Sequence, residues 1–138
     1  LKDSEIKRVV ICSGKVFYNL LEEREKRKIN NIRILRLEQI YPFPSKTLKE
    51  MLSKTPNAEI VWCQEEPKNM GAWFFVDRRI EQVLVDIKAK LTRPTYAGRL
   101  EAASPATGSF SRHNKEQNDL VNDALELTTK KASRHAAE

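Results

Sequence analysis

Two adjacent carboxylates, Glu65 and Glu66, are the side chains best placed for chemistry in this 138-residue sequence. They follow the apolar run Ile60–Cys63 and precede Pro67 and Gly71, a pattern that predicts the carboxyl end of a strand. In open α/β sheets, ligands and partner domains meet the chain at this end. A carboxylate pair can act in catalysis if burial raises the pKa of one member. The structural alternative is that one carboxylate caps the following helix while the other pairs with a base or faces water.

The segment from Gln64 to Trp73 also has the composition of a contact surface, because it combines carboxylates, amides and aromatic side chains. We expect this segment to be exposed and to touch a preceding domain or a second subunit. The residues predicted to make the contact are Glu65, Glu66, Asn69 and Trp73.

Other candidate sites are weaker. The turn Ser13–Lys15 could receive a phosphate at a helix start, but neither GxGxxG nor GxxxxGK[ST] is present, which favours a structural turn. The hydroxyl-rich segment 104–111 lacks a GxSxG elbow, and loop capping is the preferred interpretation. Neither His113 nor His135 has a partner at ligand spacing. We therefore assign no catalytic residue and no metal site to these residues.

The two cysteines, Cys12 and Cys63, each end an apolar run and share no CxxC spacing. This pattern is typical of small buried core residues and not of a disulfide or a metal site.

The formal net charge of +6 is concentrated in residues 1–54, which hold 13 Lys and Arg against 7 Asp and Glu. Much of it lies in the acid-then-base run 22–28, which suits a solvated helix.

Neither a nucleic-acid reading module nor an apolar run long enough to span a membrane is present, so we expect neither a nucleic acid nor a membrane as a partner. The sequence begins with Leu1 and lacks a signal peptide, and we expect a piece of a longer protein or a processed product.

Apolar periodicity predicts alternating strands and helices. Strands are expected near 7–13, 32–37 and 58–63, with a fourth, edge strand at 93–98, and helices near 15–28, 47–52, 73–91 and 115–127. Strands separated by single helices favour a parallel sheet covered on both faces. The predicted fold class is α/β, a three-layer α/β/α sandwich with a mostly parallel sheet. One domain is expected over residues 1–128, followed by a polar, frayed tail at 129–138.

Five strings occur in a family-specific order: 12–16 (CSGKV), 36–44 (RLEQIYPFP), 62–73 (WCQEEPKNMGAW), 96–99 (YAGR) and 104–108 (SPATG). Together they resemble the carboxyl-terminal domain of the decarboxylating, thiamine-diphosphate-dependent component of 2-oxoglutarate dehydrogenase. The resemblance covers about residues 7–125.

This resemblance implies a transketolase-like carboxyl-terminal domain at the end of a long, homodimeric oxidoreductase chain. Thiamine diphosphate and Mg²⁺ would lie between earlier domains of two subunits. The succinyl group from 2-oxoglutarate would pass to a lipoyl-bearing succinyltransferase of the tricarboxylic acid cycle. The implied location is the bacterial cytoplasm or the mitochondrial matrix. The family's cofactor contacts belong to the earlier domains, so none is carried onto this sequence, and the fragment alone is expected to be inactive and to bind no cofactor.

Some family members bind an allosteric activator, acetyl coenzyme A or AMP. The resemblance places Gln39 and Lys46 as the effector-binding residues, with Lys46 facing a phosphate. A regulatory module for a phosphorylated effector is therefore the alternative to a structural and docking domain. A third hypothesis is that the chain is the equivalent domain of another thiamine-dependent enzyme, such as transketolase. The five strings quoted above disfavour this hypothesis.

Overall fold

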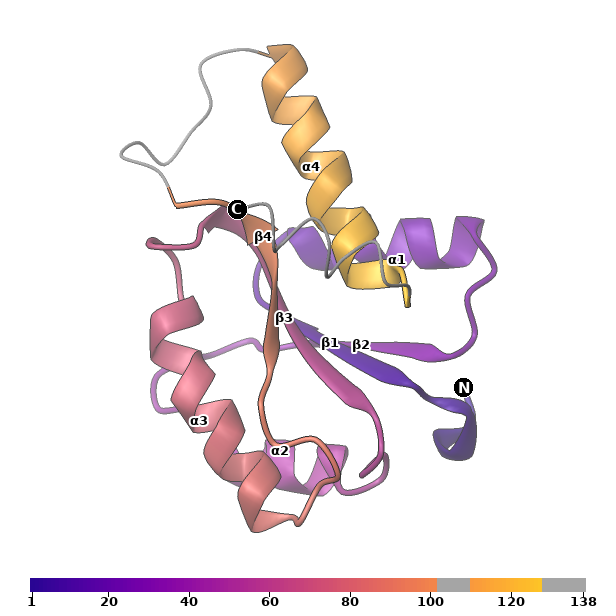
Figure 1. The fold of residues 1–138 in the computed structure, drawn as a ribbon, viewed down its shortest axis with the longest axis vertical. Coiled ribbons are helices and arrows are strands. Elements are labelled where there is room, and N and C mark those ends of the chain that lie inside the picture. Colours follow the sequence, from indigo (N-terminus) through magenta and orange to yellow (C-terminus); the bar gives the residue numbers. More distant parts are fainter. Residues whose placement is uncertain (102–109, 128–138) are drawn as a thin grey trace.

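The computed structural model describes residues 1–101 and 110–127 (Figure 1). Residues 104–109 of the hydroxyl-rich segment and the predicted tail 129–138 lie outside these residues. In chain order the elements are η1 (Asp3–Glu5), β1 (Arg8–Cys12), α1 (Val16–Lys26), β2 (Ile32–Arg36), α2 (Ser45–Leu52), β3 (Glu59–Pro67), α3 (Trp73–Asp86), β4 (Thr95–Arg99) and α4 (Phe110–Leu125).

The sheet has the strand order β2-β1-β3-β4, and every pair is parallel. All five residues of β1 are buried, as expected for a central strand covered on both faces. The three predicted parallel strands and the fourth strand at the sheet edge are thus confirmed.

The order of the strands explains which face each helix covers. The chain moves from β1 to β2 in one direction across the sheet, then from β2 to β3 and from β3 to β4 in the other. Right-handed crossovers therefore place α1 on one face and α2 and α3 on the opposite face. Figure 1 shows this arrangement, with α4 beside α1. The predicted three-layer α/β/α sandwich is confirmed.

Each face of the sheet has its own apolar core, because alternate residues of a strand point to opposite faces. Val9, Ile11, Ile60 and Trp62 pack with residues of α2 and α3, including Leu48, Leu52, Val76, Ile80 and Val83. Val10, Cys12, Val61 and Cys63 pack with Val16, Leu20, Leu120, Val121, Ala124 and Leu125 of α1 and α4. The apolar periodicity of the long helices predicted the inward residues Val76, Ile80, Val83 and Leu84 of α3 and Leu120, Val121, Ala124 and Leu125 of α4, and these face the cores. The same pattern included Leu91, but this residue lies beyond the end of α3 and is exposed.

Strand β3 is longer than predicted. The sequence suggested an end at Cys63, but the strand continues to Pro67, whose partner in β4 is Arg99 across an irregular register. The amide of Lys68 also donates to the carbonyl of Arg99 at 3.1 Å. The polar residues after Cys63 therefore belong to a paired strand, because β4 runs beside them.

Helix α3 is shorter than the predicted 73–91, and a left-handed lysine sets its end. Lys88 has a φ of 57°, and its amide donates to Val85 O while that of Ala89 donates to Leu84 O. This is the bonding of a Schellman motif, which satisfies carbonyls of the last helical turn. Helix α1 ends in the same way at Lys28. Helix α4 begins at Phe110, earlier than the expected 115.

Arg8 joins the first strand to the last helix. Its side chain is 3% exposed, and Nε and Nη2 donate to Glu59 Oε2 at 3.0 and 2.8 Å. Nη1 donates to the carbonyls of Asp123 and Ala124 at 3.0 and 2.9 Å. These carbonyls lie in the last turn of α4, where the helix lacks internal donors and carries partial negative charge. One buried guanidinium thus caps α4 and pairs with β3.

We predict that Arg8→Met lowers the free energy of unfolding by about 3 kcal/mol, because it removes the donor from a carboxylate and two helix-terminal carbonyls. Urea unfolding followed by circular dichroism measures the change. Arg78→Met is the matched control, since Arg78 is an exposed partner of Glu81 on the surface of α3. Equal midpoints for the two variants would contradict the role of Arg8.

Candidate functional site

The carboxyl end of β3 is organised by the side chain of Gln64, which is only 3% exposed. Its Oε1 accepts from Trp62 Nε1 at 2.8 Å and from the amide of Trp73 at 3.0 Å. Its Nε2 lies 3.1, 3.0 and 2.9 Å from the carbonyls of Glu66, Pro67 and Met70, to which it donates. A single carboxamide therefore holds the strand end, the loop and the first amide of α3.

Gly71 is required by this arrangement. Its φ is +68°, and a Cβ built there would lie 3.1 Å from Gln64 Nε2 and 3.1 Å from Glu66 Cβ. The left-handed conformation disfavours other residues, and the space that a side chain needs is filled. The glycine after the two carboxylates thus makes room for the carboxamide of Gln64.

The expectation that the whole run Gln64–Trp73 is exposed is wrong at both of its ends. Gln64 is buried and Trp73 is 6% exposed, with its ring 5.4 Å from that of Tyr96. Glu66 and Asn69 are exposed, and Glu65 is half-buried. Only the middle of the predicted contact surface therefore reaches solvent, and Trp73 supports it from beneath.

The structural alternative for the two carboxylates is also corrected. Ala72 stands at the N-cap of α3, and no side chain caps the helix from that position. The amide of Trp73 instead bonds to Gln64. Glu65 Oε1 lies 3.4 Å from Gln117 Nε2, which donates to it from α4. The sequence predicted that a carboxylate would bond the start of the helix, but the carboxamide of Gln64 makes this bond.

Arg99 is the centre of a second polar cluster, where β4 meets α4. Its side chain is 8% exposed, and Nη2 lies 3.2 Å from His113 Nδ1 and 3.1 Å from Gln117 Oε1. Arg99 Nε is 3.6 Å from Glu116 Oε2. Because an arginine can only donate, the contact with His113 uses Nδ1 as the acceptor. The cluster ties α4 to the sheet, a role that sequence reasoning missed for both Arg99 and His113.

The hydroxyl of Tyr96 accounts for the glycine and the tight backbone of the Tyr-Ala-Gly-Arg string, residues 96–99. It donates to the carbonyl of Arg99 at 2.6 Å. A Cβ at Gly98 would collide with this hydroxyl and would lie 2.9 Å from the carbonyl of Gln64. Gly98 thus allows β4 to approach the end of β3 closely.

The two predicted effector-binding residues lie in separate local settings. Gln39 is exposed, and its Nε2 donates to the carbonyl of Tyr41 at 2.6 Å. Lys46 is exposed in the first turn of α2. Gln39 therefore stabilises the turn that follows β2, and an effector role for either residue stays a prediction.

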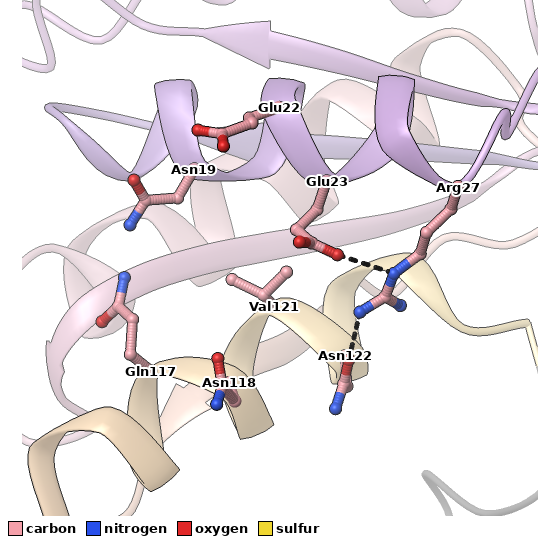
Figure 2. A pocket seen from close by; sticks show the side chains of 8 residues that line it. All are labelled: Asn19, Glu22, Glu23, Arg27, Gln117, Asn118, Val121 and Asn122. Atoms are coloured by element: carbon pink, nitrogen blue, oxygen red, sulfur yellow. Dashed lines mark hydrogen bonds and ion pairs between the residues drawn. The ribbon is translucent and has the colours of Figure 1, made fainter. Parts of the chain in front are cut away.

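A polar groove of about 370 Å³ lies between α1 and α4. Figure 2 shows Arg27 bridging it, with bonds to Glu23 at 2.9 Å and to Asn122 at 2.6 Å. The rest of the lining is Asn19, Glu22, Gln117, Asn118 and Val121. The bond between Arg27 and Asn122 joins the two helices, and the apolar Val121 lies in the same lining.

Cys12 and Cys63 are buried and lie in register on the neighbouring strands β1 and β3, within the same apolar core, which confirms their prediction as core residues. Burial raises the pKa of the Cys12 thiol to about 12, and the charge of Arg36 offsets this only in part. Within residues 1–101 and 110–127, no group of three or more His, Cys, Asp or Glu residues could hold a metal ion.

Comparison with known proteins identifies the chain. The family model described as 2-oxoglutarate dehydrogenase C-terminal matches residues 1–125. The chain belongs to this family. It is 58% identical over 124 residues to the 2-oxoglutarate dehydrogenase E1 components of Brucella anthropi, Brucella ovis and Brucella melitensis biotype 2. The alignments cover 90% of the chain and 12% of each relative. The resemblance read from the five strings is confirmed.

Gln64 and Arg99, the centres of the two polar clusters, each lie in one of those five strings. The string from Trp62 to Trp73 contains Gln64 together with its bonding partners and Gly71. The string from Tyr96 to Arg99 builds the contact between β4 and α4. In this member of the 2-oxoglutarate dehydrogenase C-terminal family, both strings thus specify structure at the carboxyl edge of the sheet.

We predict that Gln64→Met lowers the free energy of unfolding by at least about 3 kcal/mol, because several buried polar groups lose their partner at about 1–3 kcal/mol each. Methionine keeps the length of the side chain, so packing changes little. Urea unfolding followed by tryptophan emission reports directly on Trp62 and Trp73. Gln82→Met is the control, because Gln82 is exposed on α3 and its amide nitrogen donates to the surface carboxylate of Asp86. A Gln64 variant as stable as this control would refute the role of the carboxamide.

We also predict a loss of stability in alkali through Cys12. Below pH 9, the thiol is protonated in both the folded and the unfolded chain, so its contribution is unchanged. Between pH 9 and about pH 12, the unfolded chain releases the proton and the folded chain retains it, so stability falls as pH rises. Unfolding of the parent and of Cys12→Ala across pH 8–11 isolates this term. Parallel curves for the two proteins would contradict the raised pKa.

Proposed function

We propose that this chain is a structural and docking domain of a 2-oxoglutarate dehydrogenase E1 component and carries no catalytic residue of its own. The observation that supports this most strongly is the state of the carboxyl edge of the sheet. At this edge, where α/β enzymes commonly bind ligands, the side chains of Gln64 and Arg99 bond to the protein itself. The edge is built to hold the fold.

The activity of the complete enzyme is part of the same proposal. The chain spans 12% of the length of the E1 relatives it matches, so the remainder of such a protein would hold the catalytic machinery. We propose that the full enzyme is a homodimeric oxidoreductase of the tricarboxylic acid cycle. It would decarboxylate 2-oxoglutarate and pass succinyl to the lipoyl-bearing succinyltransferase component. Its transketolase-like carboxyl-terminal domain would be the present chain.

Thiamine diphosphate supplies the carbanion that attacks a 2-oxo acid when it is bound with Mg²⁺. The described residues do not fit this group, since they include no carboxylate, His or Cys cluster for a metal ion. The turn at Gly14, with a φ of +82°, lacks the glycine pattern of a diphosphate loop. We propose that other domains of the full-length enzyme bind the cofactor.

The proposed docking surface is the middle of the Gln64–Trp73 run. Glu66 and Asn69 are exposed there, Glu65 is half-buried, and Trp73 at the end of the run is buried in the core. Bonds from Gln64 hold the loop in one conformation, so a partner would meet a preformed surface. The proposed location is the bacterial cytoplasm or the mitochondrial matrix. In residues 1–101 and 110–127, no helix is long and apolar enough to cross a membrane. No described contact favours the effector-binding alternative.

Isothermal titration calorimetry tests whether the cofactor binds outside this domain. We expect the 138-residue chain to bind no thiamine diphosphate in the presence of Mg²⁺, and a full-length E1 protein carrying this domain to bind it. Removal of the domain from the full-length protein is expected to weaken its assembly, measured by analytical ultracentrifugation. Micromolar binding of the cofactor by the 138-residue chain would overturn the assignment, as would a truncated protein with unchanged assembly and activity.

A further inference from the structure

A second surface, made of aromatic side chains, lies beside the proposed docking loop. We call it the aromatic patch and define it as Tyr41, Phe43, Phe74 and Phe75. Tyr41 is 66% exposed and Phe74 is 60% exposed, although both are large and partly or wholly apolar. The patch is formed by the turn that follows β2 and by the first turn of α3, so it belongs to the carboxyl side of the sheet.

Three of the four rings of the patch contact one another. The centroid of the Tyr41 ring lies 4.1 Å from that of Phe75, and Phe43 meets Phe75 edge-on at 6.4 Å. Phe43 and Phe75 also pack against the core under α2 and α3. The first turn of α3 is fixed through the bond between Gln64 and the amide of Trp73. Rings that are already ordered lose little conformational freedom when a partner covers them.

A cation is fixed next to these rings. The guanidinium carbon of Arg79 lies 3.7 Å from the centroid of Phe75, and Nη1 donates to the carbonyl of Phe75 at 2.8 Å. A guanidinium has five N–H donors, so further donors remain for a partner group. Aromatic residues together with arginine are the composition enriched at the energetic centres of protein interfaces. The matching chemistry is an apolar segment with a carboxylate near it.

We infer that the aromatic patch is the site at which the remainder of the E1 polypeptide packs against this domain. The inference rests on the proposed function. The E1 relatives contain about eight times the length aligned here, since the alignment covers 12% of each, so a large body of the same chain is available as the occupant. The patch also continues into the proposed docking loop, because Phe74 directly follows Trp73. The occupant supplies an apolar side chain over Tyr41 and Phe74 and a carboxylate to Arg79.

The test uses a full-length E1 protein that carries this domain, with the double substitution Tyr41→Ser and Phe74→Ser. Because both rings are mostly exposed, the domain itself is expected to keep its fold, which unchanged tryptophan emission would verify. We expect the rate of proteolytic release of the domain to rise at least tenfold. Val85→Ser is the matched control, since Val85 is 50% exposed in the last turn of the same helix, and it should release the domain at the parent rate.

The outcomes separate the inference from the proposed function. A double variant that is released at the control rate would overturn the patch, even if removal of the whole domain still impairs the enzyme. Dissociation of the dimer without faster release would assign the patch to a second copy and also overturn the inference. If removal of the domain leaves assembly and activity intact, the proposed function itself fails, whatever the double variant does. Faster release together with a normal control supports the patch as the internal contact.

Discussion

The carboxamide of Gln64 is the constraint on which the carboxyl edge of the sheet depends. A carboxamide can both donate and accept, so one side chain accepts from an indole N–H and a helix-start amide and donates to the carbonyls of Glu66, Pro67 and Met70. A carboxylate could not donate, and an apolar residue could do neither. The position of α3, the path of the loop before it and the close approach of Gly71 all follow from this choice. The buried carboxamide of Gln64 thus fixes the positions of the exposed residues in the loop after β3.

The fold was predictable from the sequence where apolar patterns are strong. The runs Val9–Cys12 and Ile60–Cys63 are buried on both faces and marked their strands clearly. The end of β3 was missed because Gln64 looks like a strand terminator until its partners are known. The end of α3 was missed because Lys88 adopts a left-handed conformation that its residue type does not announce. In both cases, the deciding contacts are made in three dimensions and leave only a weak local pattern.

The candidate site was predictable in place but not in role. The acidic pair was expected at the carboxyl end of a strand, and the structure puts it there. The side chain that bonds the first amide of α3 and the burial of Trp73 both depend on packing against other elements. The spacing of residues in the sequence does not predict that packing. His113 carried no recognisable pattern, since its partner Arg99 is contributed by another element. The sequence therefore indicates which polar residues lie at the carboxyl edge of the sheet, but it does not indicate which of them stabilise the fold and which could bind a partner.

The bonds of Arg8 have a consequence for how the chain matures. Its guanidinium reaches carbonyls 115 and 116 residues further along the sequence. Closing so long a loop is costly in entropy, so this contact is expected to form late in folding. During synthesis, the hydrated guanidinium of Arg8 lacks these two carbonyl partners until the last described helix has been made. The domain should therefore complete its fold only near the end of its own translation, which leaves the growing chain dependent on protection from aggregation until then.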